Sequence, residues 1–255
     1  MELNDRHVVV TGGSRGVGAA IGAAFAAAGA RVTLVARNET QLAKAASACG
    51  GGYLAADLLD LDALPALVSR MTAVAPIDIL VNNAGLGLPS AVEDLSSEQL
   101  RALFTLNALV PAELTRLVLP ALRHRAIARL VFVSSLSAQV SLPGLTAYSA
   151  TKAAVSQFAE GLRRDLSNSA IGVTTAELGP IHTEMYGEIE GYQPCADAFN
   201  RMLRLGTLRM LEPEEVATAI VMACRRDKSR VVLPRRGRSQ VVASHLPQWA
   251  ANRML

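Results

Sequence analysis

The chain of 255 residues carries a formal net charge of +3, and 51% of its residues are hydrophobic while 18% are charged. This composition excludes a disordered chain, and so small a positive charge argues against a nucleic-acid-binding protein. The length suits one α/β domain with a sizeable core. Because aromatic residues make up only 4% of the chain, that core must consist mainly of Ala, Leu and Val.

The cysteines and the N-terminal residues bear on the compartment. Cys49, Cys195 and Cys224 are widely spaced, form no CxxC pair and are odd in number, which indicates a reducing environment rather than a disulfide framework. The first six residues are too charged for a signal-peptide core, and the Ala-rich stretch 19–30 is too short to span a bilayer. We therefore expect a cytoplasmic protein.

Short aliphatic runs alternate with helical patterns along the whole chain, which is typical of parallel βαβ units. The sequence predicts a single three-layer α/β/α domain over residues 1–255, with a doubly wound parallel sheet of the Rossmann-like type. The expected strands are residues 7–11, 31–35, 53–55, 78–82, 129–134, 172–177 and 231–234. The expected helices are residues 16–28, 39–48, 62–74, 97–123, 147–168 and 214–225.

Two segments stand apart from this alternation. Residues 184–211 contain three glycines and Pro194 and form the least regular stretch, so we interpret them as a substrate-binding lid. Residues 235–255 form a basic tail that continues an arginine cluster. This cluster is either a solvated surface or a contact for an anionic membrane or an acidic carrier protein. Its members are Arg225, Arg226, Lys228, Arg230, Arg235, Arg236 and Arg238.

A glycine-rich loop follows the first expected strand and precedes the first expected helix. Gly12, Gly16 and Gly18 suit a tight turn, close backbone approach to a pyrophosphate and close packing of helix on strand. The helix N-terminus that follows favours phosphates through its free N–H groups and its dipole. This context predicts a dinucleotide site, to which Ser14, Arg15 and Val17 also belong.

The end of the second expected strand bears on the choice of cofactor. NAD sites commonly place an acidic residue here to bind the ribose 2′-hydroxyl, but this chain has Ala36 followed by Arg37. Arg15 and Arg37 each carry a guanidinium group, which can donate two hydrogen bonds to one phosphate. The sequence therefore favours NADP over NAD.

A catalytic group is predicted where Tyr148 and Lys152 lie four residues apart on one helix face. A nearby ammonium lowers the pKa of a phenol, as a general acid or base near neutral pH requires. The fifth expected strand ends in Ser134 and Ser135, at the edge where open α/β sheets place their ligands.

These motifs together resemble the short-chain dehydrogenase/reductase family, in its ordinary-length subclass. The resemblance covers about residues 7–185. It rests on the ordered set Thr11–Gly18, Asp57, Asn82 to Gly85, Asn107, Ser135, Tyr148 with Lys152, and Gly179 to Thr183.

The resemblance implies a role for each matching residue. Tyr148 is the general acid/base, Lys152 holds the nicotinamide ribose and lowers the tyrosine pKa, Ser135 holds the substrate oxygen, and Asn107 interrupts a helix and serves a proton relay. His182 has no second ligand spaced to help it, so no metal site is expected. The remaining cofactor contacts fall on Asp57, Leu58, Asn83, Ala84, Gly85, Ile181 and Thr183.

The implied function is NADP(H)-dependent interconversion of an alcohol with a ketone or aldehyde. Residues 86–88, 136–145 and 184–206 are rich in apolar side chains, so we expect a small, largely apolar substrate. Two alternatives remain open: a 3-oxoacyl thioester reductase, and a non-catalytic NADPH-binding regulatory protein.

The resemblance also bears on assembly. Family members commonly pair through the helix after Asn107 and the helix bearing Tyr148, so a homodimer is expected. A tetramer is less certain because the family's glycine-rich ending is replaced by Arg235, Arg236, Gly237 and Arg238.

Overall fold

A computed structural model describes residues 1–234, and its centre is a seven-stranded parallel sheet. The strand order is β3-β2-β1-β4-β5-β6-β7, which confirms the predicted doubly wound, Rossmann-like fold. The strands are β1 (His7–Thr11), β2 (Arg31–Ala36), β3 (Gly52–Ala55), β4 (Ile79–Asn82), β5 (Ala128–Ser135), β6 (Ile171–Leu178) and β7 (Arg230–Leu233).

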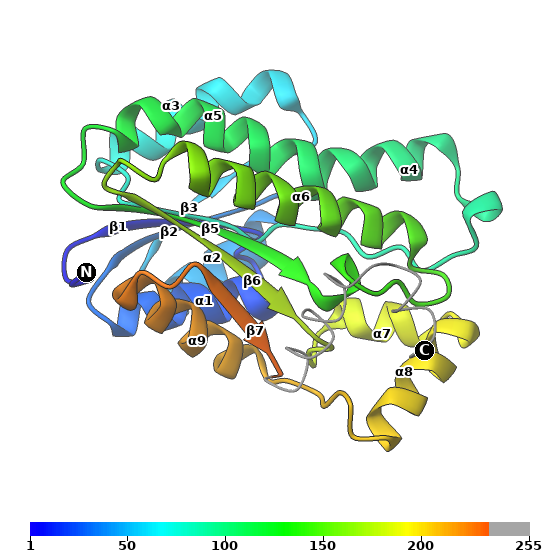
Figure 1. Cartoon of the computed structure of the whole chain (residues 1–255). Helices are drawn as coiled ribbons and strands as arrows, with labels where there is room; N and C mark the ends of the chain where they lie inside the picture. The colour runs from blue at the N-terminus through cyan, green and yellow to red at the C-terminus, as the bar shows by residue number, and fades with distance from the viewer. Residues whose placement is uncertain (235–255) are drawn as a thin grey trace.

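Helices cover both faces of the sheet, which gives the three layers expected (Figure 1). One layer contains α1 (Gly16–Ala27), α2 (Glu39–Cys49) and α9 (Pro213–Arg226). The other contains α3 (Leu64–Val74), α4 (Ser97–Phe104), α5 (Val110–Leu122) and α6 (Thr146–Asp165). The helices α7 (Glu184–Glu190) and α8 (Gln193–Arg204) lie beyond the carboxyl ends of the strands.

Side chains along the central strands point alternately to the two faces of the sheet, and this produces two separate hydrophobic cores. In β1, Val8 and Val10 pack with Phe25 of α1, whereas Val9 between them packs with Leu114 of α5. This is the period of two expected when both faces of a strand are buried. Every residue of β1 and β4 is buried, which explains why these strands read as continuous aliphatic runs in the sequence.

Local signals fix where several helices begin and end. Asn38 accepts a hydrogen bond from the Gln41 amide at the start of α2, and Gly50 ends that helix in the left-handed conformation. Ser96 and Gln99 form a reciprocal capping box at the start of α4. These caps place the helices close to the boundaries expected from the sequence.

The expected helix over residues 97–123 is not one regular helix. It is α4 and α5 joined by a π-helical turn, η3 (Thr105–Leu109). Such turns widen a helix locally and occur frequently at functional sites. The predicted asparagine, Asn107, lies in this turn and is buried.

The interpretation of residues 184–211 as largely irregular is wrong, because most of this lid is helical in α7 and α8. In α8, Cys195, Ala196 and Phe199 are buried at helical spacing, so the segment folds as an amphipathic helix, and its apolar face packs with Leu136 and Leu145. Gly187 lies inside α7, so this glycine does not prevent a helix. The basic tail predicted over residues 235–255 lies outside the described residues.

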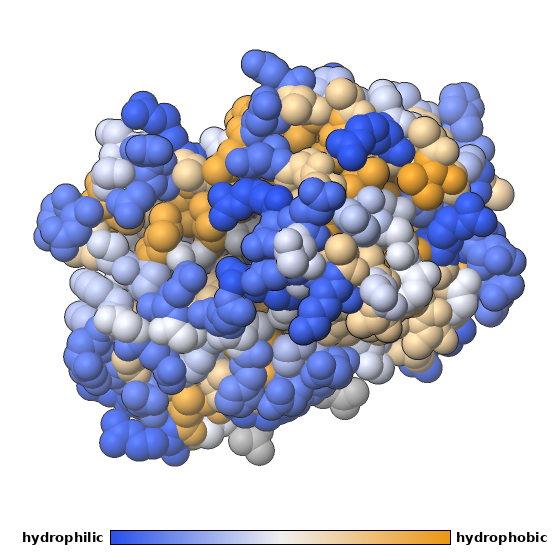
Figure 2. All heavy atoms as spheres, turned by 180° about the vertical axis from the view of Figure 1, so that it is seen from behind, coloured by the Kyte–Doolittle hydropathy of each residue, from blue (hydrophilic) through white to orange (hydrophobic). Residues whose placement is uncertain are grey.

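The surface mixes hydrophilic and hydrophobic residues. Seen from behind, hydrophobic side chains show on the upper half of the molecule, on the side of α3 to α6 (Figure 2). Within residues 1–234, one helical run, Ser97–Leu122, is apolar and long enough to cross a membrane. Its buried side chains Val110, Leu114, Val118 and Leu122 belong to the core beneath the sheet, as in a core helix of a globular protein.

The layer of α1 and α9 should depend strongly on Phe25, whose side chain is fully buried. We expect Phe25→Ala to lower the free energy of unfolding by about 3–5 kcal/mol, because it removes apolar contacts and leaves a cavity. Chemical denaturation measures this loss. Phe25→Leu should cost clearly less, and equal costs for the two variants would contradict this account of the core.

Candidate active site

A cavity of about 710 Å³ lies at the carboxyl ends of the strands. The strand order reverses between β1 and β4, and open α/β sheets bind ligands at such a switch point. The cavity extends from the glycine-rich loop after β1 to the lid, so it joins the predicted nucleotide site and the predicted catalytic group. Apart from Asn107, every site residue predicted from the sequence lines it.

The glycine-rich loop is shaped as a phosphate cradle. Gly12 and Gly16 have φ angles of +67° and +53°, which glycine adopts without strain. A Cβ at Gly18 would lie 2.1 Å from the carbonyl oxygen of Gly12, so a side chain there has no room. Arg15 precedes α1 without a capping side chain, which leaves the first amides of that helix available to an anion.

A hydrogen-bonded strap fixes this loop to the segment after β4. The Thr11 hydroxyl accepts from the amides of Asn83 and Ala84 at 3.0 and 3.1 Å, and Asn83 Nδ2 donates to the Thr11 carbonyl at 2.9 Å. The strap explains why Asn83, Ala84 and Gly85 lie along the same cavity as the glycines. These residues fit a dinucleotide, because glycine lets the loop pack closely against its neighbours while the first amides of α1 remain available to a phosphate.

The adenosine end of the cavity lies beyond the carboxyl ends of β2 and β3. Ala36, Arg37, Asp57 and Leu58 line it together, as the sequence predicts. Arg37 is exposed, and Ala36 supplies no carboxylate. This end therefore carries a cation and lacks the acidic residue after β2 that commonly binds a ribose 2′-hydroxyl.

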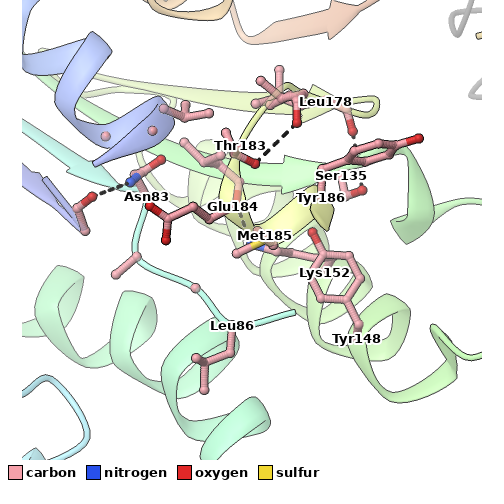
Figure 3. A pocket seen from close by; sticks show the side chains of 18 of the residues that line it. Asn83, Leu86, Ser135, Tyr148, Lys152, Leu178, Thr183, Glu184, Met185 and Tyr186 are labelled. Carbon is pink, nitrogen blue, oxygen red and sulfur yellow. Dashed lines mark hydrogen bonds between the residues drawn. The ribbon is translucent and has the colours of Figure 1, made fainter. Parts of the chain in front are cut away.

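The catalytic group lies between this region and the lid (Figure 3). The Ser135 hydroxyl hydrogen-bonds the phenol of Tyr148 and donates to the Leu178 carbonyl at 3.3 Å. Lys152 Nζ donates to the Val133 carbonyl at 3.0 Å and lies 5.7 Å from the centroid of the Tyr148 ring. The structure thus brings Ser135, Tyr148 and Lys152 together from β5 and α6.

The neighbouring hydroxyl of Ser134 has a different environment. It donates to the carbonyl of Lys152 at 3.0 Å and hydrogen-bonds the Ser156 hydroxyl at 2.7 Å. Ser134 therefore ties β5 to α6 beneath the catalytic group. This agrees with the choice of Ser135, rather than Ser134, as the residue that holds the substrate oxygen.

The pKa of Tyr148 is shifted in the opposite direction to the one expected from the sequence. Burial raises the pKa of Tyr148, and the hydrogen bond with Ser135 only partly opposes this rise. The expected lowering of that pKa by Lys152 is therefore not observed. The reason is burial of both groups: burial lowers the pKa of Lys152 to about 8, and it outweighs the other influences on the pKa of Tyr148.

Asn107 connects the π-helical turn to the catalytic helix. Its Oδ1 accepts from the Leu86 amide at 2.7 Å, and its Nδ2 donates to the Leu86 carbonyl at 2.9 Å and to the Thr151 hydroxyl at 3.1 Å. Gly85 lies between Asn107 and Lys152, since a Cβ on Gly85 would be 3.1 Å from Asn107 Oδ1 and 3.4 Å from Lys152 Nζ. Asn107 is thus placed next to Lys152, as the resemblance implies.

The last predicted cofactor residues follow β6 and reach across the cavity. Ile181 pairs with Leu211 in an isolated parallel bridge, and the Thr183 hydroxyl donates to the Ile181 carbonyl at 3.3 Å. A Cβ at Gly16 would lie 3.3 Å from Thr183 Cγ2. This segment therefore rests directly on the glycine-rich loop.

Sequence reasoning named the lid as a segment but missed the individual side chains that form its apolar interior. Tyr186, Phe199 and Met202 line the cavity, and Tyr186 contacts Phe199 edge to face at 5.8 Å between ring centroids. The helical spacing of Cys195, Phe199 and Met202 was the available signal. It was hidden by the glycines and proline that suggested a loop.

The close approach at Gly18 gives a direct test of the cradle. We expect Gly18→Ala to weaken dinucleotide binding by at least about tenfold, because the added methyl group displaces the Gly12 carbonyl and the loop. Isothermal titration with NADPH measures the effect. Gly161→Ala is the matched control, since nothing lies within 4 Å of a Cβ at that position in α6; a folded Gly18→Ala protein with unchanged affinity would contradict the cradle.

The buried ammonium of Lys152 should cost stability. Its folded-state pKa is about 8 against an ordinary 10.5, so between these values the unfolded chain holds a proton that the folded protein has released. The free energy of unfolding therefore rises with pH between about 8 and 10.5, and the destabilisation caused by burying the Lys152 ammonium is greatest below pH 8. We expect Lys152→Met to raise the free energy of unfolding by about 1–3 kcal/mol at pH 7.

Denaturation of wild type and variant at several pH values measures this difference. The gain should shrink as the pH rises from 8 to 10, because the lysine is then neutral in the folded protein. No gain at pH 7, or a gain that grows with pH, would contradict the burial cost.

Comparison with known proteins agrees with this geometry. The chain is similar to the ketoacyl reductase HetN of Nostoc sp., with 30% identity over 237 residues covering 91% of this chain and 79% of that protein. It is 31% identical to the 3-dehydrosphinganine reductase of Danio rerio, over 87% of this chain and 69% of that protein.

A solved structure has the same fold. The 3-oxoacyl (acyl-carrier-protein) reductase of Agrobacterium tumefaciens with NADP bound superposes with a TM-score of 0.78 and 29% identity, covering 91% of this chain and 93% of that one. The short chain dehydrogenase family profile matches residues 6–193. The chain therefore belongs to the short-chain dehydrogenase/reductase family and is an oxidoreductase.

Proposed function

We propose that the protein is an NADP(H)-dependent oxidoreductase that interconverts an apolar ketone or aldehyde and the corresponding alcohol. One observation carries the proposal: a single cavity runs from the glycine cradle to the Ser135–Tyr148 pair and on into the apolar interior of the lid. Such a cavity can hold a nucleotide and a substrate side by side, with the phenol of Tyr148 between them.

Tyr148 is the group that moves the proton. Its raised pKa keeps the phenol protonated at neutral pH, which is the form that donates a proton to the oxygen of a carbonyl substrate. Ser135 supplies a second hydroxyl at the same oxygen, where negative charge develops. A bound nicotinamide would supply the hydride chemistry, and Lys152 would hold its ribose.

Asn107 and Lys152 form the route by which Tyr148 regains a proton after it has donated one to the substrate. Lys152 has a pKa of about 8 and therefore exchanges protons near neutral pH. Asn107 lies in the π-helical turn beside it and is held by both polar groups of Leu86. This geometry supports the relay that the family resemblance implies.

The preference for NADP rests on charge. Arg15 and Arg37 line the nucleotide half of the cavity, and Ala36 replaces the acid that would repel a 2′-phosphate. The Agrobacterium relative binds NADP, which supports the same choice. The expected result is a larger thermal shift with NADPH than with NADH at equal concentration.

The substrate half of the cavity favours an uncharged, apolar molecule. Its walls include Leu142, Leu145, Tyr186, Phe199 and Met202. Within the described chain, the Asp, Glu, Lys and Arg residues that line the cavity belong to the nucleotide half or to the catalytic group; they are Arg15, Arg37, Asp57, Lys152 and Glu184. An apolar wall of this kind excludes ionic substrates because their desolvation would be uncompensated.

A 3-oxoacyl thioester is the second candidate substrate. The Nostoc relative is a ketoacyl reductase and the Agrobacterium structure is a 3-oxoacyl (acyl-carrier-protein) reductase, which favours this reading. The carrier contact suggested by the basic tail falls on residues 235–255, outside the described residues. A panel of simple ketones and 3-oxoacyl thioesters separates the two substrate classes.

Homodimer formation is proposed through α4, α5 and α6. Leu100, Phe104, Leu109 and Phe158 are large apolar side chains exposed on these helices and the π-helical turn. A second copy would cover them, as in pairs formed by the helices after Asn107 and around Tyr148. The three free cysteines suit the cytoplasmic location proposed with it.

Tyr148→Phe tests the proposed chemistry. Removing the phenolic oxygen should lower kcat for ketone reduction by at least about 100-fold, since a positioned general acid contributes that much or more. NADPH affinity should change little. The measurement is NADPH oxidation with the ketone and thioester panel, alongside nucleotide titration of both proteins.

The same measurements distinguish an enzyme from a non-catalytic NADPH-binding regulatory protein. Wild-type protein that binds NADPH but turns over no substrate in the panel would favour the non-catalytic regulatory alternative. Equal turnover by wild type and Tyr148→Phe would contradict the assigned proton donor.

A further inference from the structure

The lid touches the glycine-rich loop at two adjacent points. Arg15, which precedes α1, forms an ion pair with Glu184, the first residue of α7. Beside it, Thr183 packs against Gly16, where a Cβ would lie 3.3 Å from Thr183 Cγ2. The ion pair joins residues 169 positions apart in the chain, across the nucleotide half of the cavity.

Glu184 is placed where a nucleotide's negative charge belongs. It points across the cavity towards the side on which Asn83 lies (Figure 3). Within the described residues, Asp57 and Glu184 are the acidic residues that line the cavity, and Asp57 lies at the adenosine end. A carboxylate opposite the N-terminus of α1 therefore uses the same positive environment that phosphates require.

We propose that Glu184 is a specificity-determining residue for the nucleotide, because it competes with the 2′-phosphate for the guanidinium of Arg15. The inference rests on the nucleotide site proposed above and deepens it. Arg15 can bind a 2′-phosphate only by giving up or sharing its pairing with Glu184. The lid carboxylate thus weakens the very contact that distinguishes NADP from NAD.

The two possible effects of Glu184 can be separated by ligand chemistry. Simple repulsion between the Glu184 carboxylate and the nucleotide would weaken the binding of 5′-AMP as well as that of 2′-phosphate ligands, and it would act whether or not Arg15 is present. Competition for Arg15 weakens only ligands that carry the 2′-phosphate. Adenosine 2′,5′-bisphosphate and 5′-AMP differ by that one phosphate, and neither depends on hydride transfer.

Glu184→Gln is the test, read by calorimetric titration of these two ligands and of NADPH. Because exposed ion pairs contribute at most about 1 kcal/mol, we expect adenosine 2′,5′-bisphosphate to bind about three- to fivefold more tightly, with 5′-AMP nearly unchanged. The gain should shrink at high salt, because both side chains are more than half exposed.

Two further variants make the result specific. Glu188→Gln removes the same charge from an exposed position on α7 that does not line the cavity, so it should leave both affinities at wild-type values. In an Arg15→Ala background, Glu184→Gln should produce no gain for the bisphosphate. Tightening by Glu188→Gln, an equal gain for both ligands, or a gain that persists without Arg15 would overturn the competition.

Failure of the proposed function has a different signature. If the wild-type protein bound none of the three ligands, the nucleotide site itself would be overturned. If it bound them with the expected preference for the 2′-phosphate while Glu184→Gln changed nothing, only the role of Glu184 would be overturned.

Discussion

The reversal of strand order between β1 and β4 is the constraint on which the site depends. It separates the crossover connections of the two halves of the sheet, so the loops after β1 and β4 diverge and leave a cleft. The Thr11 hydroxyl accepts hydrogen bonds from the amides of Asn83 and Ala84, and these bonds tie the end of β1 to the segment after β4. The phosphate cradle and the catalytic helix are thereby placed on opposite sides of one cavity.

Burial then sets the chemistry of the catalytic group. Lys152 is only 5% exposed, and its ammonium is held by the Val133 carbonyl rather than by a carboxylate. A cation buried in this way destabilises the fold but exchanges protons near neutral pH. The same burial raises the pKa of the Tyr148 phenol, which favours its protonated form, the form that the proposed proton donor requires.

The sequence predicted the features that depend on short-range patterns. Strand alternation and the glycine-rich turn between β1 and α1 follow from local sequence patterns, and Tyr148 and Lys152 share a helix face by spacing alone. The two lid helices were missed because Gly187 suggested a loop, although a single glycine weakens a helix without excluding it and α7 includes this residue. The direction of the Tyr148 pKa shift depends on burial by side chains distant in sequence, which no local pattern reveals.

The lid contacts make the two halves of the cavity interdependent. The segment that supplies Tyr186 to the substrate wall begins at Thr183 and Glu184, which rest on the phosphate loop. Arg15 of the phosphate loop thus pairs with the same short helix, α7, that supplies Tyr186 to the substrate wall. An exposed ion pair is weak enough for a phosphate to replace. A stronger Arg15–Glu184 ion pair would oppose nucleotide binding more, because the phosphate would have to displace it at a greater cost in free energy.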